Sequence, residues 1–365
     1  MSDRKLAHVE KIVSLSPIEG ADRIEVATVL GWQCVVKKGE FNVNDKVIYI
    51  EVDSIVPPKP EFEFLKDRKY RVRTIKLRKQ ISQGLVLPLS TLAKSYYKEG
   101  EDVTELLGII KYDPQAQKEA MEQDVRLKNP IVKFMSRYKW FRNIFLKRAS
   151  GGFPSWIRKT DEERIQNMPQ VFQEEYRNLF SVTEKLDGQS ATYFLKRRLN
   201  KSWIGDKYLY EFGVCSRNLR RGKPDNSSYW TIARKYNIER VLADISVKEN
   251  LEYLVLQGEI IGESIQANKY KVSGYDFYAY NLVTPKGRLD TEVARDVLDE
   301  FDIKTVPLID IIQLPSNIEE LVKMSVGMSS LKNDTMREGL VFRSLRNNEI
   351  SFKVINPDFL LKNGE

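Results

Sequence analysis

Histidine and cysteine are almost absent from this chain of 365 residues. His8 is the single histidine, which excludes catalytic triads, two-histidine metal sites and histidine acid/base pairs. Cys34 and Cys215 are too few for a disulfide framework or a cysteine-based zinc site, so we expect a reducing, intracellular setting. Any chemistry must therefore depend on Lys, Asp, Glu, Arg and a hard metal ion.

The sequence also lacks long apolar runs and an N-terminal segment that resembles a signal peptide. No stretch approaches the roughly 20 apolar residues of a membrane span, and residues 1–5 do not resemble a signal peptide, so we expect no membrane partner. The composition is instead 42% hydrophobic and 30% charged, which is typical of a globular protein with a sizeable core. A net charge of +8 suits a polyanionic partner. The length favours two domains.

The first 111 residues contain many short strand-like segments with turns between them. The predicted strands are residues 8–14, 23–30, 33–37, 46–52, 70–77 and 84–87. Short strands without intervening helices favour a small barrel, and the segment 35–40 after a turn at Gly20 resembles an OB-type module. Such modules bind oligonucleotides in general, so this resemblance indicates a partner and not a reaction.

Two arginines are expected on one face of the predicted strand 70–77. Arg71 and Arg73 are two residues apart, so an extended backbone would present both guanidinium groups together, as phosphate binding requires. A charged edge strand that resists pairing with another chain explains the same pattern equally well.

Residues 112–150 change character. The apolar residues Ile131, Phe134, Met135, Tyr138, Phe141 and Phe145 recur at helical spacing with Lys and Arg between them. We favour a basic amphipathic connector docked by its aromatic stripe over a helix that faces RNA or membrane. Gly151 and Gly152 mark its end, so we predict an OB domain at 1–111, a linker at 112–150 and a second domain at 151–365.

The second domain begins with a possible helix start. Thr160 can act as an N-cap with Glu163 as the return partner of a capping box, which leaves Arg164 and Gln166 unexplained.

A lysine between two acids follows at residues 182–188. The segment predicts a strand that ends at an Asp187-Gly188 turn, with Lys185 and Asp187 on one face and Glu184 and Leu186 on the other. A lysine amine is nucleophilic only when deprotonated, and moving its pKa from about 10.4 to near 7 requires roughly 4–5 kcal/mol. Burial or a cation held by the neighbouring acid can supply this shift. Lys-x-Asp-Gly alone is a weak signal.

Further motifs follow that lysine in a fixed order. They are residues 185–188, 212–217, 257–259, 276–281, 337–341 and 351–356. Together they make the chain similar to ATP-dependent RNA ligases of the covalent nucleotidyltransferase superfamily, in the branch with an N-terminal OB domain and no C-terminal one. The resemblance implies an α+β fold, with an OB-type barrel and a nucleotidyltransferase domain of antiparallel sheets and helices, an ATP-grasp-like ligase adenylylation fold.

The resemblance also implies roles for individual residues. Lys185 would attack the α-phosphorus of ATP, and Lys353 would assist at a phosphate oxygen. Asp187 and Glu338 would hold Mg²⁺ or Mn²⁺ through waters. The implied nucleotide-binding residues are Glu184, Lys185, Arg217, Glu259, Tyr280, Phe277, Lys353, Arg164 and Lys362.

Two of these assignments stay open at the level of sequence. Some relatives carry Lys-x-Lys in the last motif where this chain has Ile355, and Lys362 is the nearest substitute. Phe277 and Tyr280 fall on opposite faces of a strand, so one of them is core, and we favour Tyr280 as the residue that stacks on adenine.

The expected activity is the joining of RNA 3′-OH and 5′-phosphate ends by a monomer, at nicks in a duplex, in RNA repair. mRNA-capping guanylyltransferases and DNA ligases use the same lysine chemistry, but they normally carry an OB domain after the last motif, for which the chain to Glu365 leaves no room. A non-catalytic RNA-binding protein is the third possibility. The intact series of motif Lys, Arg and Glu residues disfavours it.

Overall fold

A computed structural model of the chain describes residues 5–92, 96–113, 135, 151–200, 207–222 and 225–363. The N-terminal part is built on a five-stranded antiparallel sheet of order β3-β2-β1-β4-β8. Its strands are β1 (Ala7–Pro17), β2 (Ile24–Val29), β3 (Trp32–Lys37), β4 (Lys46–Ile50) and β8 (Leu85–Pro88). Along β3, Trp32, Cys34 and Val36 are buried in alternation, so the period of two in the sequence fixes which face meets the core.

The predicted strand at 70–77 is wrong over most of its length. Only β6 (Ile75–Leu77) forms a strand, in a hairpin with β7 (Gln80–Ser82). Arg71 makes an isolated bridge to Ile55, and Tyr70 before it has a left-handed φ of 59° that interrupts a strand. Arg71 is buried, donates to Asp53 at 2.8 Å and lies 3.7 Å from the centre of the Tyr112 ring. Arg71 is thus committed to the fold, and the predicted pair of phosphate-facing guanidinium groups is not formed.

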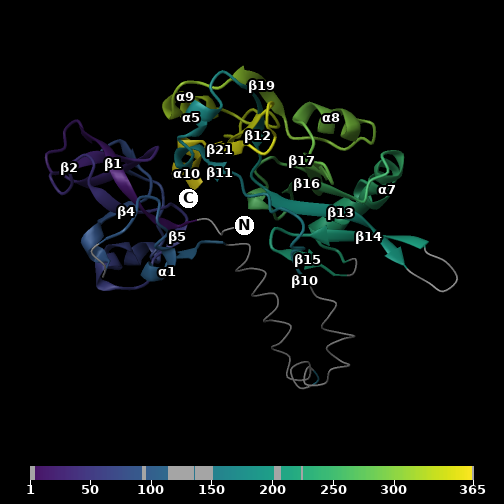
Figure 1. Cartoon of the computed structure of the whole chain (residues 1–365), viewed down its shortest axis with the longest axis horizontal. Helices are drawn as coiled ribbons and strands as arrows, with labels where there is room; N and C mark the ends of the chain where they lie inside the picture. The colour runs from purple at the N-terminus through teal and green to yellow at the C-terminus, as the bar shows by residue number, and fades with distance from the viewer. Residues whose placement is uncertain are drawn as a thin grey trace.

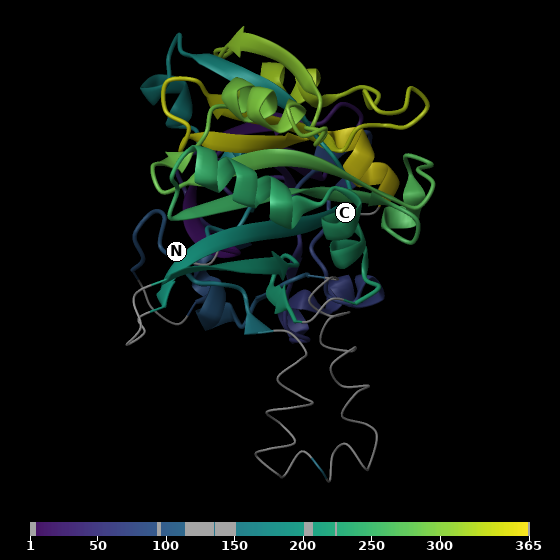
Figure 2. The ribbon, with the colours of Figure 1, turned by 90° about the vertical axis from the view of Figure 1, so that its right-hand side faces the viewer.

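The larger C-terminal part contains two further sheets. The first has seven strands in the order β10-β15-β14-β13-β16-β17-β18. They are β10 (Gly151–Gly152), β15 (Leu219–Arg221), β14 (Lys207–Cys215), β13 (Gln189–Asn200), β16 (Tyr253–Gly262), β17 (Tyr275–Thr284) and β18 (Gly287–Arg288). Helices α6 (Ser228–Lys235), α7 (Ile238–Lys248) and α8 (Thr291–Asp299) lie across one face of it (Figure 2).

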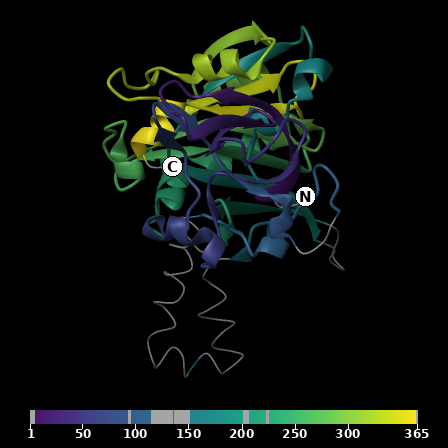
Figure 3. The same cartoon turned by 90° about the vertical axis from the view of Figure 1, so that its left-hand side faces the viewer.

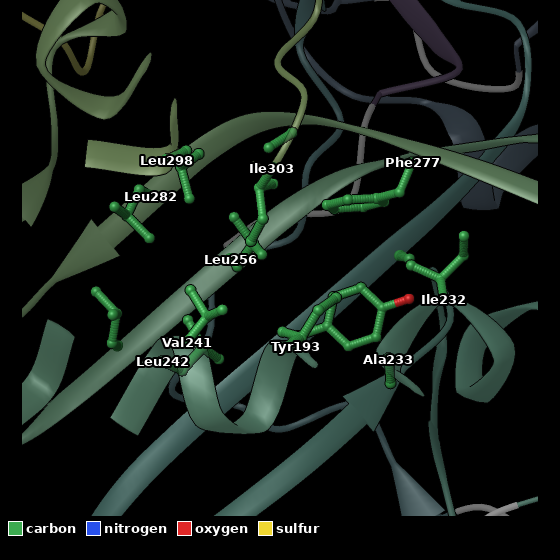
Figure 4. Packing of buried hydrophobic residues seen from close by; sticks show 14 of the residues in the cluster. Tyr193, Ile232, Ala233, Val241, Leu242, Leu256, Phe277, Leu282, Leu298 and Ile303 are labelled. Carbon is green, nitrogen blue, oxygen red and sulfur yellow. The ribbon is translucent and has the colours of Figure 1, made fainter. Parts of the chain in front are cut away.

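Apolar side chains from these helices and strands form the largest core. Tyr193 and Phe277 meet edge to face with ring centres 5.5 Å apart, and Leu242 and Leu256 pack beside them (Figure 4). The apolar spacing of three and four residues in α7 explains this contact, since it places Leu242 and Ile245 on one side of the helix.

The second sheet has five strands in the order β11-β21-β20-β12-β19. They are β11 (Glu163–Arg164), β21 (Ser351–Ile355), β20 (Gly339–Ser344), β12 (Leu179–Lys185) and β19 (Leu308–Gln313), and every pair is antiparallel except β11–β21. Helices α9 (Ile318–Ser325) and α10 (Pro357–Asn363) follow in the same part of the chain. The chain leaves β12 and enters β13 through residues 186–188, so the turn after Lys185 joins the two sheets.

The predicted capping box at Thr160 and Glu163 is wrong. Glu163 and Arg164 form β11, which pairs with β21 in parallel, and a short 3-10 turn, η4 (Ile165–Asn167), comes after it. The hydroxyl of Thr160 instead lies 3.1 Å from that of Ser190. Pairing with a distant strand has overridden the local signal.

The N-terminal sheet docks onto this segment of the C-terminal part (Figures 1 and 3). Arg164 donates to Asp53 at 3.1 Å, and the side chain of Asn167 bridges Trp32 and Glu51 at 2.6 and 2.5 Å. These bonds explain Arg164, which local signals left unexplained, as an interdomain contact. The two-part organisation and its α+β class agree with the expectation from sequence.

His8, the single histidine, lies buried beside this interface. Its Nδ1 is 2.7 Å from Glu10 and its Nε2 is 3.5 Å from Glu51. Burial disfavours the charged imidazolium, but the two carboxylates outweigh burial and raise the pKa of His8 to about 9. His8 is therefore a structural cation.

The predicted basic connector lies almost entirely outside the described residues. Of 112–150, only residues 112, 113 and 135 are described, so the linker helix and the domain boundaries stay predictions. Within the part of the chain that the structure covers, no helix is long and apolar enough to cross a bilayer.

Candidate active site

Lys185 lies against Glu338 at the edge shared by β12 and β20. The strand register pairs Lys185 with Gly339, which brings the preceding Glu338 beside it, and Nζ lies 2.7 Å from both carboxylate oxygens. The Lys185 side chain keeps 28% of its surface exposed, so it is accessible to solvent. Burial lowers the pKa of Lys185, but the charges of Glu338, Glu259 and Asp187 outweigh burial and raise it. The amine is therefore held protonated by its own neighbours.

The turn after Lys185 is fixed by contacts from three sides. Asp187 donates its amide to the Tyr270 hydroxyl at 2.9 Å, and its carboxylate contacts the Lys269 ammonium. A Cβ at Gly188 would lie 2.4 Å from the carbonyl oxygen of Ile260, so only glycine lets the turn approach β16 this closely. Leu186 points away into a small apolar cluster, as the alternation along the strand predicted.

Glu259 on β16 faces the same turn. It pairs with Ser190 in the strand register, and its Cγ would be 2.8 Å from a Cβ at Gly188. Burial, reinforced by the charges of Glu338 and Asp187, raises the pKa of Glu259 to about 8, although Lys185 and Arg217 oppose this shift. Three carboxyl groups thus crowd around one amine, and they favour a further cation.

A second cluster holds three cations around one acid. Arg217, in the turn after β14, lies 2.5 and 2.6 Å from the two carboxylate oxygens of Asp161, and Lys111 of β9 (Ile110–Lys111) lies 2.9 Å from one of them. Burial opposes the charged form of Asp161, but Lys353, Arg217 and Lys111 lower its pKa. Converging cations of this kind suit the oxygens of a phosphate.

Comparisons with known proteins agree with this geometry. A family model described as an OB-fold domain matches residues 6–89, and one described as RNA ligase matches residues 178–355. Naegleria gruberi RNA ligase, solved with PPi, is 33% identical with a TM-score of 0.81, and the match covers 99% of each chain. The chain belongs to the RNA ligase family.

Other solved forms of that Naegleria enzyme match equally well. A lysine-to-methionine mutant with AMP and Mn is 33% identical, with a TM-score of 0.79 and 98% of each chain covered. A glutamate-to-alanine mutant with ATP and Mn is 32% identical, with a TM-score of 0.80, covering 99% of this chain and all of that one. No curated protein sequence matches the chain.

The RNA ligase uses Phe277 in its core, so the assignment of Phe277 to the nucleotide is wrong. Phe277 has no exposed surface and packs against Tyr193 under the helices. Tyr280 lies on the other face of β17, where its hydroxyl is 3.0 Å from that of Ser190 and its carbonyl accepts from Arg343 at 3.2 Å. Of the two aromatic candidates, only Tyr280 faces the side of the sheet that carries Glu259.

Two other predicted nucleotide ligands, Arg164 and Glu184, point away from Lys185 in this RNA ligase, whereas the role of Lys362 stays a prediction. Arg164 points to Asp53 at the domain interface. The Glu184 side chain is 1% exposed and accepts from the Ser330 amide at 2.7 Å, because alternation along β12 turns it away from Lys185. Lys362 is exposed in the last turn of α10.

Sequence reasoning missed the residues that neutralise the site. Lys269 and Asp161 lie outside the motifs, and their charges meet Asp187 and Arg217 only after folding. Within the described ranges, no group of three or more His, Cys, Asp or Glu side chains is arranged to hold a metal ion by itself. A metal here would depend on two carboxylates supplemented by water and phosphate oxygens, as is usual for Mg²⁺.

Proposed function

We propose that Lys185 of this RNA ligase is adenylylated by ATP and that the enzyme then joins RNA 3′-OH and 5′-phosphate ends, at nicks in a duplex. The observation that carries the proposal is the contact of Lys185 with Glu338 on the next strand, with Asp187 and Glu259 beside it. The Naegleria structures with ATP, AMP, PPi and Mn support the nucleotide and the metal.

Asp187 and Glu338 fit a divalent metal by their chemistry. Both are carboxylates, each lies against an ammonium group in this structure, and Mg²⁺ and Mn²⁺ prefer such hard oxygen ligands. A bound metal would neutralise charge on the reacting phosphate and on these acids. If Glu338 is paired with a cation other than Lys185, the strongest influence that raises the pKa of Lys185 is removed, and the amine can lose its proton.

The first step forms a bond between Lys185 Nζ and the α-phosphorus of ATP. The bond from that phosphorus to pyrophosphate breaks, pyrophosphate leaves, and the nitrogen, already a neutral amine, releases one further proton to solvent. Arg217 and Lys353 bind phosphate oxygens in exchange for Asp161, and Glu259 binds a ribose hydroxyl. Tyr280 stacks on the adenine.

The remaining steps use the same groups on RNA. AMP passes from Lys185 to a 5′-phosphate, and the P–N bond is exchanged for an anhydride. A 3′-hydroxyl then attacks the 5′-phosphorus, the phosphodiester forms and AMP leaves. The cations that held the phosphates of ATP align the attacking and leaving oxygens in both steps.

One experiment separates the candidate functions. The protein is incubated with Mn²⁺ or Mg²⁺ and α-labelled ATP or GTP, and label is sought on the denatured chain. We expect label from ATP that disappears in Lys185→Ala and persists in Lys248→Ala, a lysine on α7 that is 65% exposed and serves as control. Label from GTP alone would indicate a capping-type enzyme, and no label from either nucleotide would indicate an RNA-binding protein.

The polynucleotide is tested separately with nicked duplexes that carry RNA or DNA on each side of the nick. We expect sealing when the 3′-OH strand ends in RNA, because the family acts on RNA. Sealing of all-DNA nicks at an equal rate would contradict the assignment.

A further inference from the structure

The carboxylate of Asp187 already has a cationic partner. Lys269 places its ammonium against Oδ2, with the two side chains 24% and 9% exposed. Lys269 lies in the loop between β16 and β17 and outside the six motifs. Its charge occupies the carboxylate oxygen that would hold a divalent metal or a water bound to that metal.

The loop around Lys269 has an unusual backbone that aims this side chain. Four described non-glycine residues before it or next to it, Ser264, Gln266, Ala267 and Asn268, have left-handed φ values between 46° and 65°. Such conformations persist only where surrounding contacts enforce them.

Side-chain hydrogen bonds hold the backbone of the loop that carries Lys269. Asn268 closes the loop by bonding both the amide and the carbonyl of Val272, at 3.0 and 2.9 Å. Thr335 donates to the carbonyl of Lys269 at 3.1 Å, and Tyr270 accepts the amide of Asp187 at 2.9 Å. Adjacent residues of one loop thus hold both the backbone and the carboxylate of Asp187.

The Lys269 ammonium also contacts an aromatic ring. It lies 4.3 Å from the centre of the Phe359 ring on α10, close enough for a cation–π contact. If the ammonium left Asp187, the ring could still retain it within the site.

We propose that Lys269 is an internal counter-ion of Asp187 that competes with the divalent metal, so that metal binding requires its ammonium to move off the carboxylate. The inference rests on the metal site of the proposed function and adds a residue that sets its affinity. A unit positive charge in contact with one of two metal-binding carboxylates opposes a dication at the same oxygen.

The test measures Mn²⁺ binding to the nucleotide-free, full-length protein, by the electron paramagnetic resonance signal of free Mn²⁺. Lys269→Met removes the charge and keeps the length of the side chain, and we expect it to bind Mn²⁺ at least about tenfold more tightly. Lys269→Arg keeps the charge and should stay close to the unchanged protein. Thermal melts verify that each variant is folded.

Lys271→Met is the matched control. Lys271 lies two residues away, is 71% exposed and pairs with Asp334 at 3.5 Å, so its loss changes net charge equally without touching Asp187. We expect its Mn²⁺ affinity to change less than twofold. If Lys269→Met does not fold, Lys269→Gln should show the same gain.

The outcomes separate the inference from the function on which it rests. Equal or weaker Mn²⁺ binding by Lys269→Met, with binding lost in Asp187→Asn, overturns the role of Lys269 and leaves the metal site in place. If Asp187→Asn binds Mn²⁺ as tightly as the unchanged protein, the metal site is misplaced and the inference falls with it. Equal gains in Lys269→Met and Lys271→Met would reduce the effect to net charge, and that also overturns it.

Discussion

Replacing Gly188 by alanine tests how closely the Lys185 turn must approach β16. The added Cβ would lie 2.4 Å from the carbonyl oxygen of Ile260 and 2.8 Å from Cγ of Glu259, where ordinary contacts begin at 3.4 Å. The nearer atom belongs to the backbone of a central strand, so it cannot rotate aside. The turn and the strand must therefore separate by about 1 Å.

This separation should slow catalysis in a protein that still folds. Overpacking of this kind costs about 1–3 kcal/mol of unfolding free energy. The same turn carries Lys185 and Asp187, and a misplacement of about 1 Å can lower a rate by about 100-fold. We therefore expect a folded protein whose label transfer from ATP is about 100 times slower.

The assay compares thermal melts and single-turnover labelling with α-labelled ATP. Gly151→Ala is the control, because a Cβ there meets no atom within 4 Å and its φ is not left-handed. It should leave both measurements unchanged. Labelling of Gly188→Ala at a rate within threefold of the unchanged enzyme would refute the close approach as a requirement.

Three further predictions concern charge and packing. Glu338→Gln removes the strongest influence that raises the pKa of Lys185, so acylation of Lys185 by an amine reagent should begin at lower pH; an unchanged pH profile would contradict this. His8 has its folded pKa raised from 6.5 to about 9, so the stability from its protonated form, about 3 kcal/mol, is present below pH 6.5 and lost as the pH rises through 9. Melts of His8→Gln should lack that pH dependence. Phe277→Ala should lose about 3–5 kcal/mol of stability, whereas Tyr280→Leu should weaken ATP binding with little change in melting; the reverse pattern would exchange their roles.

Sequence predicted the elements whose signal is local or repeated. The predicted strand at 33–37 is β3, and its alternation follows directly from which face is buried. The motif order also identified Lys185, Glu259 and Glu338, which the register of β12 with β20 and of β13 with β16 brings together.

Long-range contacts account for what sequence missed. Glu163 and Arg164 pair with a strand almost 190 residues away, which no capping signal could reveal. Lys269 and Asp161 find their partners only through folding, and nothing in their neighbourhoods distinguishes them from surface charges. Arg71 fitted a phosphate-binding strand by spacing, but a left-handed residue before it and the carboxylate of Asp53 decided its position.

The central claim is that one amine forms the covalent bond to AMP. The most direct measurement is peptide mapping by mass spectrometry after the protein reacts with ATP and Mn²⁺ in the absence of RNA. The account predicts AMP on the peptide that contains Lys185, and on no peptide when Lys185 is replaced by alanine. AMP on another residue, or an unmodified chain under conditions in which the protein still seals RNA, would contradict it.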